Sequence, residues 1–289
     1  MKKILALTLA LALCLGMLSA CGTSGSAAEA SASAPAEAAA PTEAAAPAEE
    51  AAAPADSAAE PAGEFTTITE GVLTMSTNAA FPPYEMTTDD GGFEGIDVEI
   101  AEAIADKLGL TLQIDDVDFD AALLAVQQGK SDIVMAGVTV NEDRLAVMDF
   151  SDSYATGVQV IVTKEGSDVT LDNLGDHMIG TQRATTGNIY CTDDYGEDHV
   201  TAYDNCLTAA QALNNGQIDC IVIDSAPADE LVKANPGFQV LDTEYVTEDY
   251  AIGMAKGNTA LVNAVNQALK ELTDDGTVQK IVDKYITAE

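Results

Sequence analysis

From residue 72 onward, segments with the pattern of β-strands alternate with segments that have the pattern of amphipathic helices. Ile96, Ile100, Ile104 and Leu108 recur every four residues and mark one face of a helix that ends near Gly109. Such alternation favours a parallel-type sheet with helices on both faces. The expected strands are 72–77, 110–114, 133–136, 178–181, 200–203, 220–224 and 251–255. The expected helices are 96–108, 119–128, a short one capped by Asn141, one from Thr186, 205–214, one reaching Asn235, 259–273 and 278–285.

The pattern occurs twice in about 220 residues, which is enough chain to bury a substantial core. We therefore expect two α/β lobes. Ligands of such sheets bind at the carboxyl ends of the strands, so the loops that follow the strands are the candidate site.

The first residues have the features of an export signal. Lys2 and Lys3 precede an apolar run at 4–15 that is too short to span a membrane. We expect a signal peptide at 1–20. The ending Leu18-Ser19-Ala20-Cys21 resembles a bacterial lipobox, in which Cys21 is lipidated, and two acyl chains such as palmitate hold a domain at a membrane. The alternative is a simple secreted protein in which Cys21 lies near the cleavage site.

The segment that follows the signal consists almost entirely of Ala, Pro, Glu, Ser, Gly and Thr. It contains no aromatic residue with which to build a core, and its prolines interrupt any helix. We expect residues 21–64 to be the lipidated cysteine and a disordered tether, anchored to the outer face of the cell membrane.

The charge of the chain excludes some functions. There are 12 Lys and Arg residues against 48 Asp and Glu residues, for a net charge of -36. Nucleic-acid binding requires a basic patch, so we expect no nucleic-acid partner. The simplest explanation of the surplus is solubility outside the cell.

The cysteines and histidines indicate no metal or cofactor site. The sequence has no Cys-x-x-Cys motif, and its histidines are His177 and His199. Cys220 lies in an apolar run and is expected in the core. Cys191 and Cys206 are a candidate pair in an oxidising exterior, which the sequence alone does not decide.

Two of the loops carry charges suited to a zwitterion. The sequence contains two arginines, Arg144 and Arg183, and a guanidinium grips a carboxylate through two parallel hydrogen bonds. The alternative for Arg144 is a salt bridge within the protein, since acidic residues adjoin it. Asp224 ends an apolar strand, where it either meets a ligand ammonium or caps the next helix.

Two further loops supply apolar and anion-binding groups. The loop 77–85 brings aromatic rings and Asn78 to a strand end, unless Phe81 simply fills the core. Thr185 and Thr186 start a helix, where free backbone N–H groups bind anions or the side chains merely cap the helix. Together the loops predict a site in which Arg144 and the threonine amides face a carboxylate and Asp224 faces an ammonium. The rings of Phe81 and Phe119 would flank an apolar stem.

These segments, in order, resemble the bacterial extracellular solute-binding proteins of family 3, the receptors of polar-amino-acid ABC transporters. The resemblance covers residues 66–289. The matching stretches are Thr77 to Glu85, Gly95-Ile96-Asp97-Val98, Phe119 with Ala125-Val126-Gln127-Gln128-Gly129, Ala136 to Arg144, Asp149-Phe150-Ser151-Asp152, Thr185-Thr186-Gly187 and Ile223-Asp224.

The resemblance implies a two-lobed periplasmic-binding-protein-like fold of type II. Each lobe is a mixed sheet flanked by helices, and two hinge strands join them. Lobe 1 comprises 66–154 and 250–289, and lobe 2 comprises 158–246. The crossings lie near Tyr154 to Val158 and Val246 to Tyr250.

The resemblance also implies roles for the loop residues. The ligand α-carboxylate is bound at Arg144 with help from Thr139, Thr185 and Thr186. The α-ammonium is bound at Asp224 and at a backbone carbonyl near Gly137. The side chain lies between Phe81 and Phe119, and Asn78 and Gln182 read its end. Relatives often have Asp in place of Asn78 and Gly in place of Ala184, and a neutral Asn78 weakens the case for a basic side chain.

The expected partners are a free amino acid and an ABC transporter permease, and we expect a monomer. One alternative is a sensory module that reports the ligand to another protein. A secreted enzyme is a further alternative, but Glu85 is the only obvious spare carboxylate, and no Ser/His/Asp or Cys/His set is visible. We therefore expect no catalytic residue.

Overall fold

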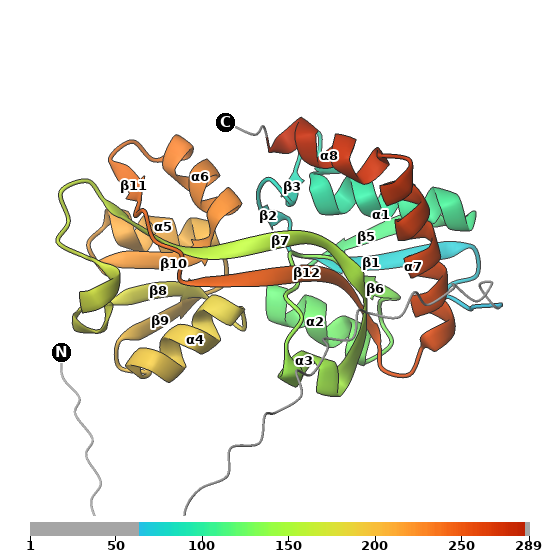
Figure 1. Cartoon of the computed structure of the whole chain (residues 1–289), viewed down its shortest axis with the longest axis horizontal. Coiled ribbons are helices and arrows are strands. Elements are labelled where there is room, and N and C mark those ends of the chain that lie inside the picture. Colours follow the sequence, from blue (N-terminus) through green and yellow to red (C-terminus); the bar gives the residue numbers. More distant parts are fainter. Residues whose placement is uncertain (1–63, 287–289) are drawn as a thin grey trace, which may run out of the picture. The chain divides into compact units, whose positions relative to one another are not determined.

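A nine-stranded mixed sheet runs through both expected lobes (Figure 1). The computed structural model describes residues 64–286, so the expected signal peptide, Cys21 and the tether up to residue 63 lie outside the described residues. The strand order is β5-β1-β6-β12-β7-β10-β8-β9, and β11 pairs with β7. The strands are β1 Val72–Thr77, β5 Thr111–Asp116, β6 Ile133–Val134, β7 Met148–Lys164, β8 Ile179–Gln182, β9 Val200–Tyr203, β10 Cys220–Asp224, β11 Phe238–Val240 and β12 Val246–Ala255.

Helices pack on the sheet, and a small separate sheet adjoins lobe 1. The small sheet has the order β2-β3-β4, with β2 Ala80–Phe81, β3 Glu85–Thr87 and β4 Phe93–Glu94. The helices are α1 Ile96–Leu108, α2 Phe119–Gln127, α3 Glu142–Val147, α4 Thr186–Tyr195, α5 Cys206–Asn214, α6 Ser225–Ala234, α7 Thr259–Asp274 and α8 Thr277–Tyr285, with a 3-10 helix at Leu171–Asp176.

The expected strands and helices are confirmed within a few residues, and the main difference is the long strand β7. A hinge strand was expected only near Tyr154 to Val158, whereas β7 spans Met148–Lys164. Its first half carries Asp149 and Asp152 and lacks an apolar alternation. Its partner β12, Val246–Ala255, joins the expected crossing at Val246 to Tyr250 and the expected strand 251–255 into one strand. Both strands are stabilised by pairing with each other, which sequence patterns do not report.

The pairing directions explain how the two lobes meet. Within lobe 1, β1 is parallel to β5 and β6, and within lobe 2, β8 is parallel to β9 and β10. The sheet is mixed because β7 runs antiparallel to β12 and β10. The segment Val246 to Tyr250 pairs with Gln159 to Ala155, so β7 and β12 cross between the lobes as one two-stranded ribbon. The exact lobe boundaries stay a prediction.

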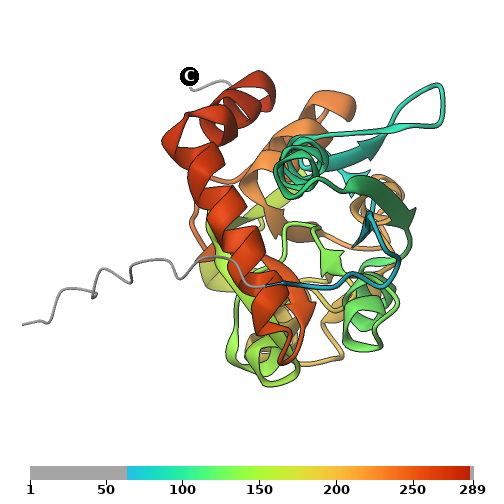
Figure 2. The same cartoon turned by 90° about the vertical axis from the view of Figure 1, so that its right-hand side faces the viewer.

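Strand residues alternate between two core layers, as the period of two requires. In β6 and the following residues, Ile133 and Met135 pack with α1 and α7, whereas Val134 and Ala136 pack with α2. In lobe 2 the same alternation separates Ile221 and Ile223 from Cys220 and Val222. Each lobe therefore has helices on both faces of its part of the sheet. Figure 2 shows α7 and α8 along one side of lobe 1.

The three described cysteines are buried free thiols. Cys220 lies in the core, as expected. The candidate pair is not formed, because Cys191 packs with the Cys220 face of the sheet and Cys206 packs on the opposite face. Burial raises the pKa of the Cys206 thiol to about 11 and that of Cys191 to about 12, so both are protonated at neutral pH.

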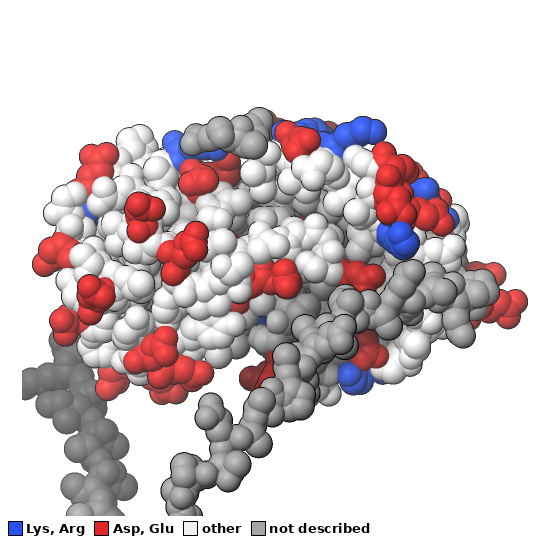
Figure 3. Space-filling view, in the orientation of Figure 1, with Lys and Arg blue, Asp and Glu red and all other residues white. Residues whose placement is uncertain are grey.

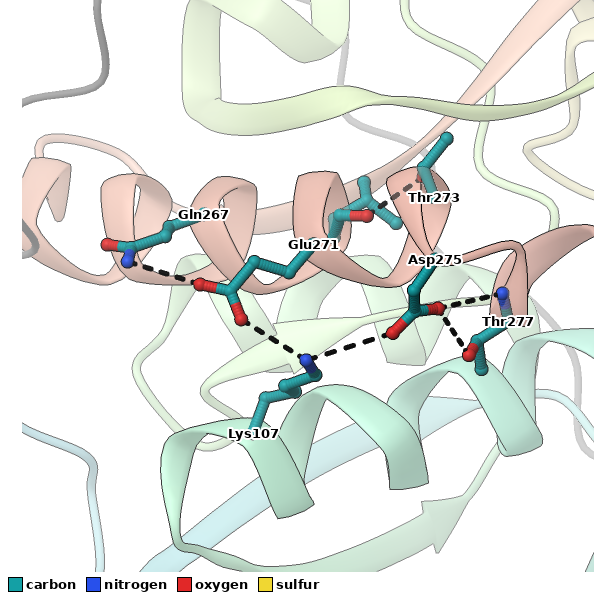
Figure 4. A network of polar contacts seen from close by, with 7 residues as sticks. Lys107, Gln267, Glu271, Thr273, Asp275 and Thr277 are labelled. Atoms are coloured by element: carbon teal, nitrogen blue, oxygen red, sulfur yellow. Dashed lines mark hydrogen bonds and ion pairs between the residues drawn. The ribbon is translucent and has the colours of Figure 1, made fainter.

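A polar network on the surface connects α1 to α7 (Figure 4). Lys107 of α1 lies 3.2 Å from Glu271 and 3.9 Å from Asp275, and Asp275 also accepts hydrogen bonds from Thr277. These side chains are a third to a half exposed, so solvent screens the ion pairs and each contributes little to stability. The helices are held mainly by their apolar faces.

The acidic surplus is spread over the surface. On the face shown in Figure 3, Asp and Glu side chains are scattered over both lobes, and Lys and Arg side chains are fewer. Within residues 64–286, no helix combines the length and the apolar character that crossing a membrane requires.

Replacing Ile104 tests the contact between α1 and the sheet. Ile104 is fully buried in the larger core cluster, so Ile104→Ala removes apolar contacts and leaves a cavity. We expect it to lower the free energy of unfolding by about 2–5 kcal/mol in urea titrations. Glu102→Ala, an exposed position on the same helix, should change it by less than about 0.5 kcal/mol. Equal effects of the two variants would contradict this packing.

Replacing Gly157 tests the crossing of β7 and β12. A methyl group at this position would overlap the Tyr250 hydroxyl and lie 2.6 Å from Asp224 Oδ1. We expect Gly157→Ala to destabilise the protein by about 1–3 kcal/mol through overpacking. Thr156→Ala, exposed on the same strand, is the matched control. A thermal midpoint of Gly157→Ala at the wild-type value would show that the close approach is absent.

Candidate functional site

Every residue predicted to contact a ligand lines one cavity between the two lobes. The predicted residues fall in loops at the carboxyl ends of strands or at helix starts, as the sheet topology requires. Lobe 1 contributes Asn78, Phe81, Phe119, Gly137, Thr139 and Arg144, and lobe 2 contributes Gln182, Thr185, Thr186 and Asp224. The cavity is completed by Ala136 and Glu85, which were not among the predicted residues.

Arg144 is a buried cation without an acidic partner. Asn141 caps α3 by accepting a hydrogen bond from the Arg144 N–H, at 2.9 Å, and this fixes the start of the helix. The guanidinium donates to the carbonyls of Thr139 at 2.7 Å and Ala184 at 3.1 Å, and it lies 5.4 Å from the centre of the Phe119 ring. Among the described residues, no carboxylate lies within ion-pair distance of it.

The burial of Arg144 has an electrostatic cost. Only 7% of the residue is exposed, and the loss of water lowers the pKa of the guanidinium to about 10. The negative charges of Glu248 and Asp224 oppose this shift from a distance. Arg144 is still charged at neutral pH, so the site contains a desolvated positive charge that an anion would neutralise.

The start of α4 provides donors on the lobe 2 side of the cavity. Thr185 caps the helix by accepting from Asn188 N–H at 3.2 Å, and its hydroxyl donates to the Gln182 carbonyl at 2.8 Å. The Thr186 hydroxyl donates to Glu248 at 2.9 Å. Both hydroxyls are therefore engaged within the protein, and the backbone N–H groups of the first turn and the positive end of the helix dipole are the anion-binding elements.

Asp224 supplies the negative charge of the cavity. Its carboxylate accepts hydrogen bonds from the Tyr250 hydroxyl and from Gln159 Nε2, the latter at 2.9 Å. Burial raises the pKa of Asp224 to about 6, and these two hydrogen bonds work against the shift. At pH 7 the carboxylate is ionised and nearly enclosed, so it is suited to a cationic group of a ligand.

The remaining wall combines aromatic rings and amides. Phe81 stacks on Tyr84 with ring centres 5.9 Å apart, and the ring of Phe119 faces Arg144. Asn78 and Gln182 lie on opposite lobes and contact each other, with Gln182 Nε2 donating to Asn78 Oδ1 at 2.9 Å. Apolar rings with a few placed polar groups are typical of small-molecule sites.

The lobes are in contact across the cavity. Besides the amide pair, Arg144 of lobe 1 bonds to Ala184 of lobe 2, and the Cys206 thiol donates to the Ala80 carbonyl at 3.1 Å. The free space is small, with about 20 Å³ open to the centre of a water molecule, which is room for one or two waters. An amino acid fits only after the walls have moved apart.

Several polar residues around the cavity were not predicted. Glu248 and Gln159 lie on the crossing strands and share a hydrogen bond of 2.9 Å, and Asp97 accepts the Gly137 N–H at 2.9 Å. Glu85 follows the aromatic loop. The sequence carries a weak signal for Asp97 and Glu85, acidic residues inside the matched stretches, and none for Glu248, whose neighbours in the chain are equally polar.

Ala184 adopts an unusual backbone conformation at the site. Its φ of 61° lies in the left-handed region, which costs a residue with a side chain about 1–2 kcal/mol. This conformation accompanies the hydrogen bond from Arg144 to its carbonyl. The strain is therefore located at the junction of the two lobes.

The arrangement can bind a zwitterion by its opposite charges. Arg144 and the start of α4 present positive charge to the cavity, and Asp224 presents negative charge. Among the described residues, no group of three or more His, Cys, Asp or Glu side chains is placed to hold a metal ion.

Comparisons with known proteins identify the family of the chain. Residues 73–288 match the family described as bacterial extracellular solute-binding proteins, family 3. The chain is similar to a probable histidine-binding protein of Neisseria gonorrhoeae, with 33% identity over 226 residues that cover 75% of this chain and 84% of the relative. It is also similar to the L-cystine-binding protein TcyJ of Escherichia coli, with 30% identity over 223 residues, covering 76% and 84%.

Solved structures support the same assignment. An ancestral arginine-binding protein bound to glutamine has 36% sequence identity and a TM-score of 0.72, and the match covers 76% of this chain and 100% of that chain. The fold class, a two-lobed mixed α/β fold with flanking helices, is thereby confirmed. The chain belongs to the bacterial extracellular solute-binding proteins of family 3.

Proposed function

We propose that this protein captures a free polar α-amino acid between its lobes outside the cytoplasm and delivers it to an ABC importer. The observation that carries the proposal is that one cavity is lined by two buried, oppositely charged residues, Arg144 and Asp224. Within residues 64–286, Arg144 forms no ion pair with an acid. A free amino acid supplies the missing carboxylate and an ammonium on one carbon. The relatives named above are a probable histidine-binding protein, an L-cystine-binding protein and an ancestral arginine-binding protein bound to glutamine, so each is named for a polar amino acid.

The α-carboxylate binds at Arg144, helped by Thr139, Thr185 and the N–H groups at the start of α4. Charge-assisted hydrogen bonds of this kind are strong, and exclusion of water strengthens them further. Thr186 assists through its backbone, since its hydroxyl is bonded to Glu248.

The α-ammonium binds at Asp224 and at a backbone carbonyl near Gly137. The aliphatic part lies between Phe81 and Phe119, and Asn78 with Gln182 reads the end of the side chain. The hydrogen bond between Gln182 and Asn78 breaks when the ligand side chain inserts between them. Amide groups serve as both donors and acceptors, which suits a polar side chain.

Capture requires the lobes to open and close. The ligand makes contacts with both lobes only in the closed form, so its affinity difference drives closure. Bending takes place at the ribbon formed by β7 and β12, the only strands that run between the lobes in the described part of the chain. The importer then distinguishes the closed form from the open one.

The proposal also covers where the protein is held in the cell and that it is a monomer. Cys21 is lipidated and becomes the mature N-terminus when the signal peptide is removed. The tether 21–64 gives a monomeric domain the reach to meet a permease. The protein is a binding protein and not an enzyme. Asp224, a carboxylate of the cavity, accepts hydrogen bonds from Tyr250 and Gln159, and burial raises the pKa of the three described thiols, Cys191, Cys206 and Cys220.

Replacing Arg144 tests the carboxylate site. We expect a thermal-shift screen of residues 65–289 against the common amino acids to give a hit, because a ligand that binds the folded state raises the melting temperature. Arg144→Met should weaken binding of that hit by about 2–5 kcal/mol, roughly 30-fold to several-thousand-fold in Kd. Arg183→Met is the matched control, since Arg183 is half-exposed and paired with Asp204 at 3.0 Å.

Retained binding in Arg144→Met, or equal loss in Arg183→Met, would show that the guanidinium of Arg144 does not hold the ligand. Circular dichroism of both variants establishes that they are folded. An absence of any hit among the amino acids would contradict the ligand class itself.

Small-angle scattering tests closure. Saturating ligand is expected to lower the radius of gyration of the folded part, because the open form becomes depopulated. The matched measurement uses Arg144→Met at the same ligand concentration, where the radius should stay at its ligand-free value. An unchanged radius in the wild-type protein despite full occupancy would refute movement of the lobes.

A further inference from the structure

Glu248 is a buried acid on the crossing ribbon to which the proposed function assigns no role of its own. It lies on β12, which in Figure 1 runs between the lobe that carries α4 and the lobe that carries α3, and it is 5% exposed. Its side chain is not part of the cavity wall. A carboxylate buried in this way is costly unless donors surround it, so its contacts indicate what it does.

The start of α4 is bound to Glu248. The Thr186 hydroxyl donates to Glu248 Oε2 at 2.9 Å. Tyr190 lies four residues further along α4, on the same face of the helix. Burial raises the pKa of the Tyr190 hydroxyl, and the charge of Glu248 and a hydrogen bond to it add to the shift. Glu248 therefore contacts the end of the helix that provides the anion-binding N–H groups.

The same carboxylate oxygen is connected to Asp224. The buried Gln159 of β7 donates from Nε2 to Glu248 Oε2 and to Asp224 Oδ2, at 2.9 Å each. A primary amide has two N–H donors, so both are used to bridge the two carboxylates. The separation between the start of α4 and Asp224 is therefore set through Glu248 and Gln159.

The residues that follow Glu248 on β12 are attached to lobe 1. The backbone of 249–251 is hydrogen-bonded to that of 138–140, with N···O distances of 3.0 and 3.1 Å. In this loop the Thr139 carbonyl accepts from Arg144 at 2.7 Å. One short stretch of β12 thus contacts the binding elements of lobe 2 through a side chain and those of lobe 1 through its main chain.

The charge of Glu248 acts on both charged residues of the cavity. Burial lowers the pKa of Arg144 to about 10, and Glu248 is the largest of the influences that oppose this shift. Burial raises the pKa of Asp224 to about 6, the hydrogen bond from Tyr250 opposes the shift, and the like charge of Glu248 adds to it. Glu248 therefore supports the cation and disfavours the neighbouring anion.

We propose that Glu248 is a positioning residue of the ligand site, which holds the start of α4 at a constant separation from Asp224. This inference rests on the proposed function. The carboxylate and the ammonium of an α-amino acid are attached to one carbon, so the groups that bind them must keep a constant separation. A preformed surface on lobe 2 binds more tightly, because it need not be ordered when the amino acid arrives.

The first test needs no amino acid. Hydrogen exchange followed by mass spectrometry reports the protection of the amides of 188–192 in α4. Glu248→Met fills the space without a polar group, so Thr186 loses its acceptor and exchange of these amides should become several-fold faster. Glu248→Gln should exchange at the wild-type rate, because its amide oxygen accepts both hydrogen bonds.

The start of α5 is the internal control for this measurement. Asn205 caps α5 as Thr185 caps α4, and neither hydrogen bond involves Glu248. The amides of 208–212 should therefore exchange at the same rate in all variants. An unchanged rate for 188–192 in Glu248→Met would overturn the anchoring of α4.

The second test measures affinity by calorimetry. The probe is the common L-amino acid that gives the largest thermal shift with the wild-type protein. Glu248→Met should weaken its binding about 10- to 100-fold through the lost buried hydrogen bonds. Glu248→Gln should change it by less than about threefold, because the hydrogen bonds remain and the charge that is lost acts oppositely on the two ends of a zwitterion.

Asp249→Met is the matched control, an exposed acid next to Glu248 on β12 whose replacement should leave the affinity unchanged. Circular dichroism establishes that the variants are folded. Wild-type affinity of Glu248→Met, or a loss in Glu248→Gln as large as in Glu248→Met, would overturn the positioning role.

A double-mutant cycle tests whether Glu248 acts through α4. Thr186→Val removes the hydroxyl that Glu248 accepts from. Glu248→Met should then weaken binding of the same probe less in the Thr186→Val background than in the wild type. Strict additivity of the two substitutions would show that they act independently and would contradict the proposal.

The pH dependence of binding gives a readout that a merely structural residue would not change. Affinity for the probe should fall as the pH drops through about 6, because protonated Asp224 no longer attracts the ammonium. The titratable and charged groups that act on Asp224 or are acted on by it are Glu248, Tyr250, Arg144 and Tyr84. In Glu248→Gln one negative charge is removed, so the fall should occur at lower pH.

Asp249→Asn, which removes a solvent-screened charge, should keep the wild-type pH profile. Coincident profiles of Glu248→Gln and wild type would overturn the contact between Glu248 and Asp224 on which the proposal depends. If no amino acid binds the wild-type protein, the proposed function fails, and hydrogen exchange still decides whether Glu248 anchors α4. If the wild type and Glu248→Met bind an amino acid equally, the inference fails and the proposed function stands.

Discussion

The arrangement of the site depends on one buried guanidinium that is not paired with an acid. Arg144 is held by two backbone carbonyls, Thr139 in lobe 1 and Ala184 in lobe 2, and by the face of Phe119. These contacts orient the cation but do not neutralise it, because carbonyl oxygens carry only partial charge. A protein that buries a charge in this way retains a strong preference for an anion at that point, and the preference is directed by the planar guanidinium.

The crossing strands connect this charge with its counterpart. Tyr250 on β12 is fully buried, and its hydroxyl reaches Asp224 at the end of β10, passing over Gly157 of β7. Gln159, also on β7, bridges Asp224 and Glu248. The acidic side of the site is therefore fixed to the ribbon that joins the lobes, whereas Arg144 is fixed to lobe 1. A change in the ribbon alters the distance between the two charges.

Most of the strands and helices and the predicted residues of the cavity could be predicted from the sequence. The features that could not be predicted share one cause. Short apolar strands such as Cys220–Asp224 and capped helices such as α3 are local features, and loops after parallel strands converge by topology. The gathering of Arg144 and Asp224 around one cavity followed from that rule. The strand β7, and the roles of Gln159 and Glu248, depend on partners more than forty residues away. Local patterns carry no information about such pairs.

The continuity of β7 and β12 has a mechanical consequence. A two-stranded ribbon has no layer of side chains to shear along its length, and its hydrogen bonds lie across the direction of bending. The ribbon also contains register irregularities between Tyr250 and Gly253, where it is already distorted. The core residues of each lobe pack on the parts of these strands that lie to either side of it. The ribbon is therefore the place where the angle between the lobes can change without repacking of either core.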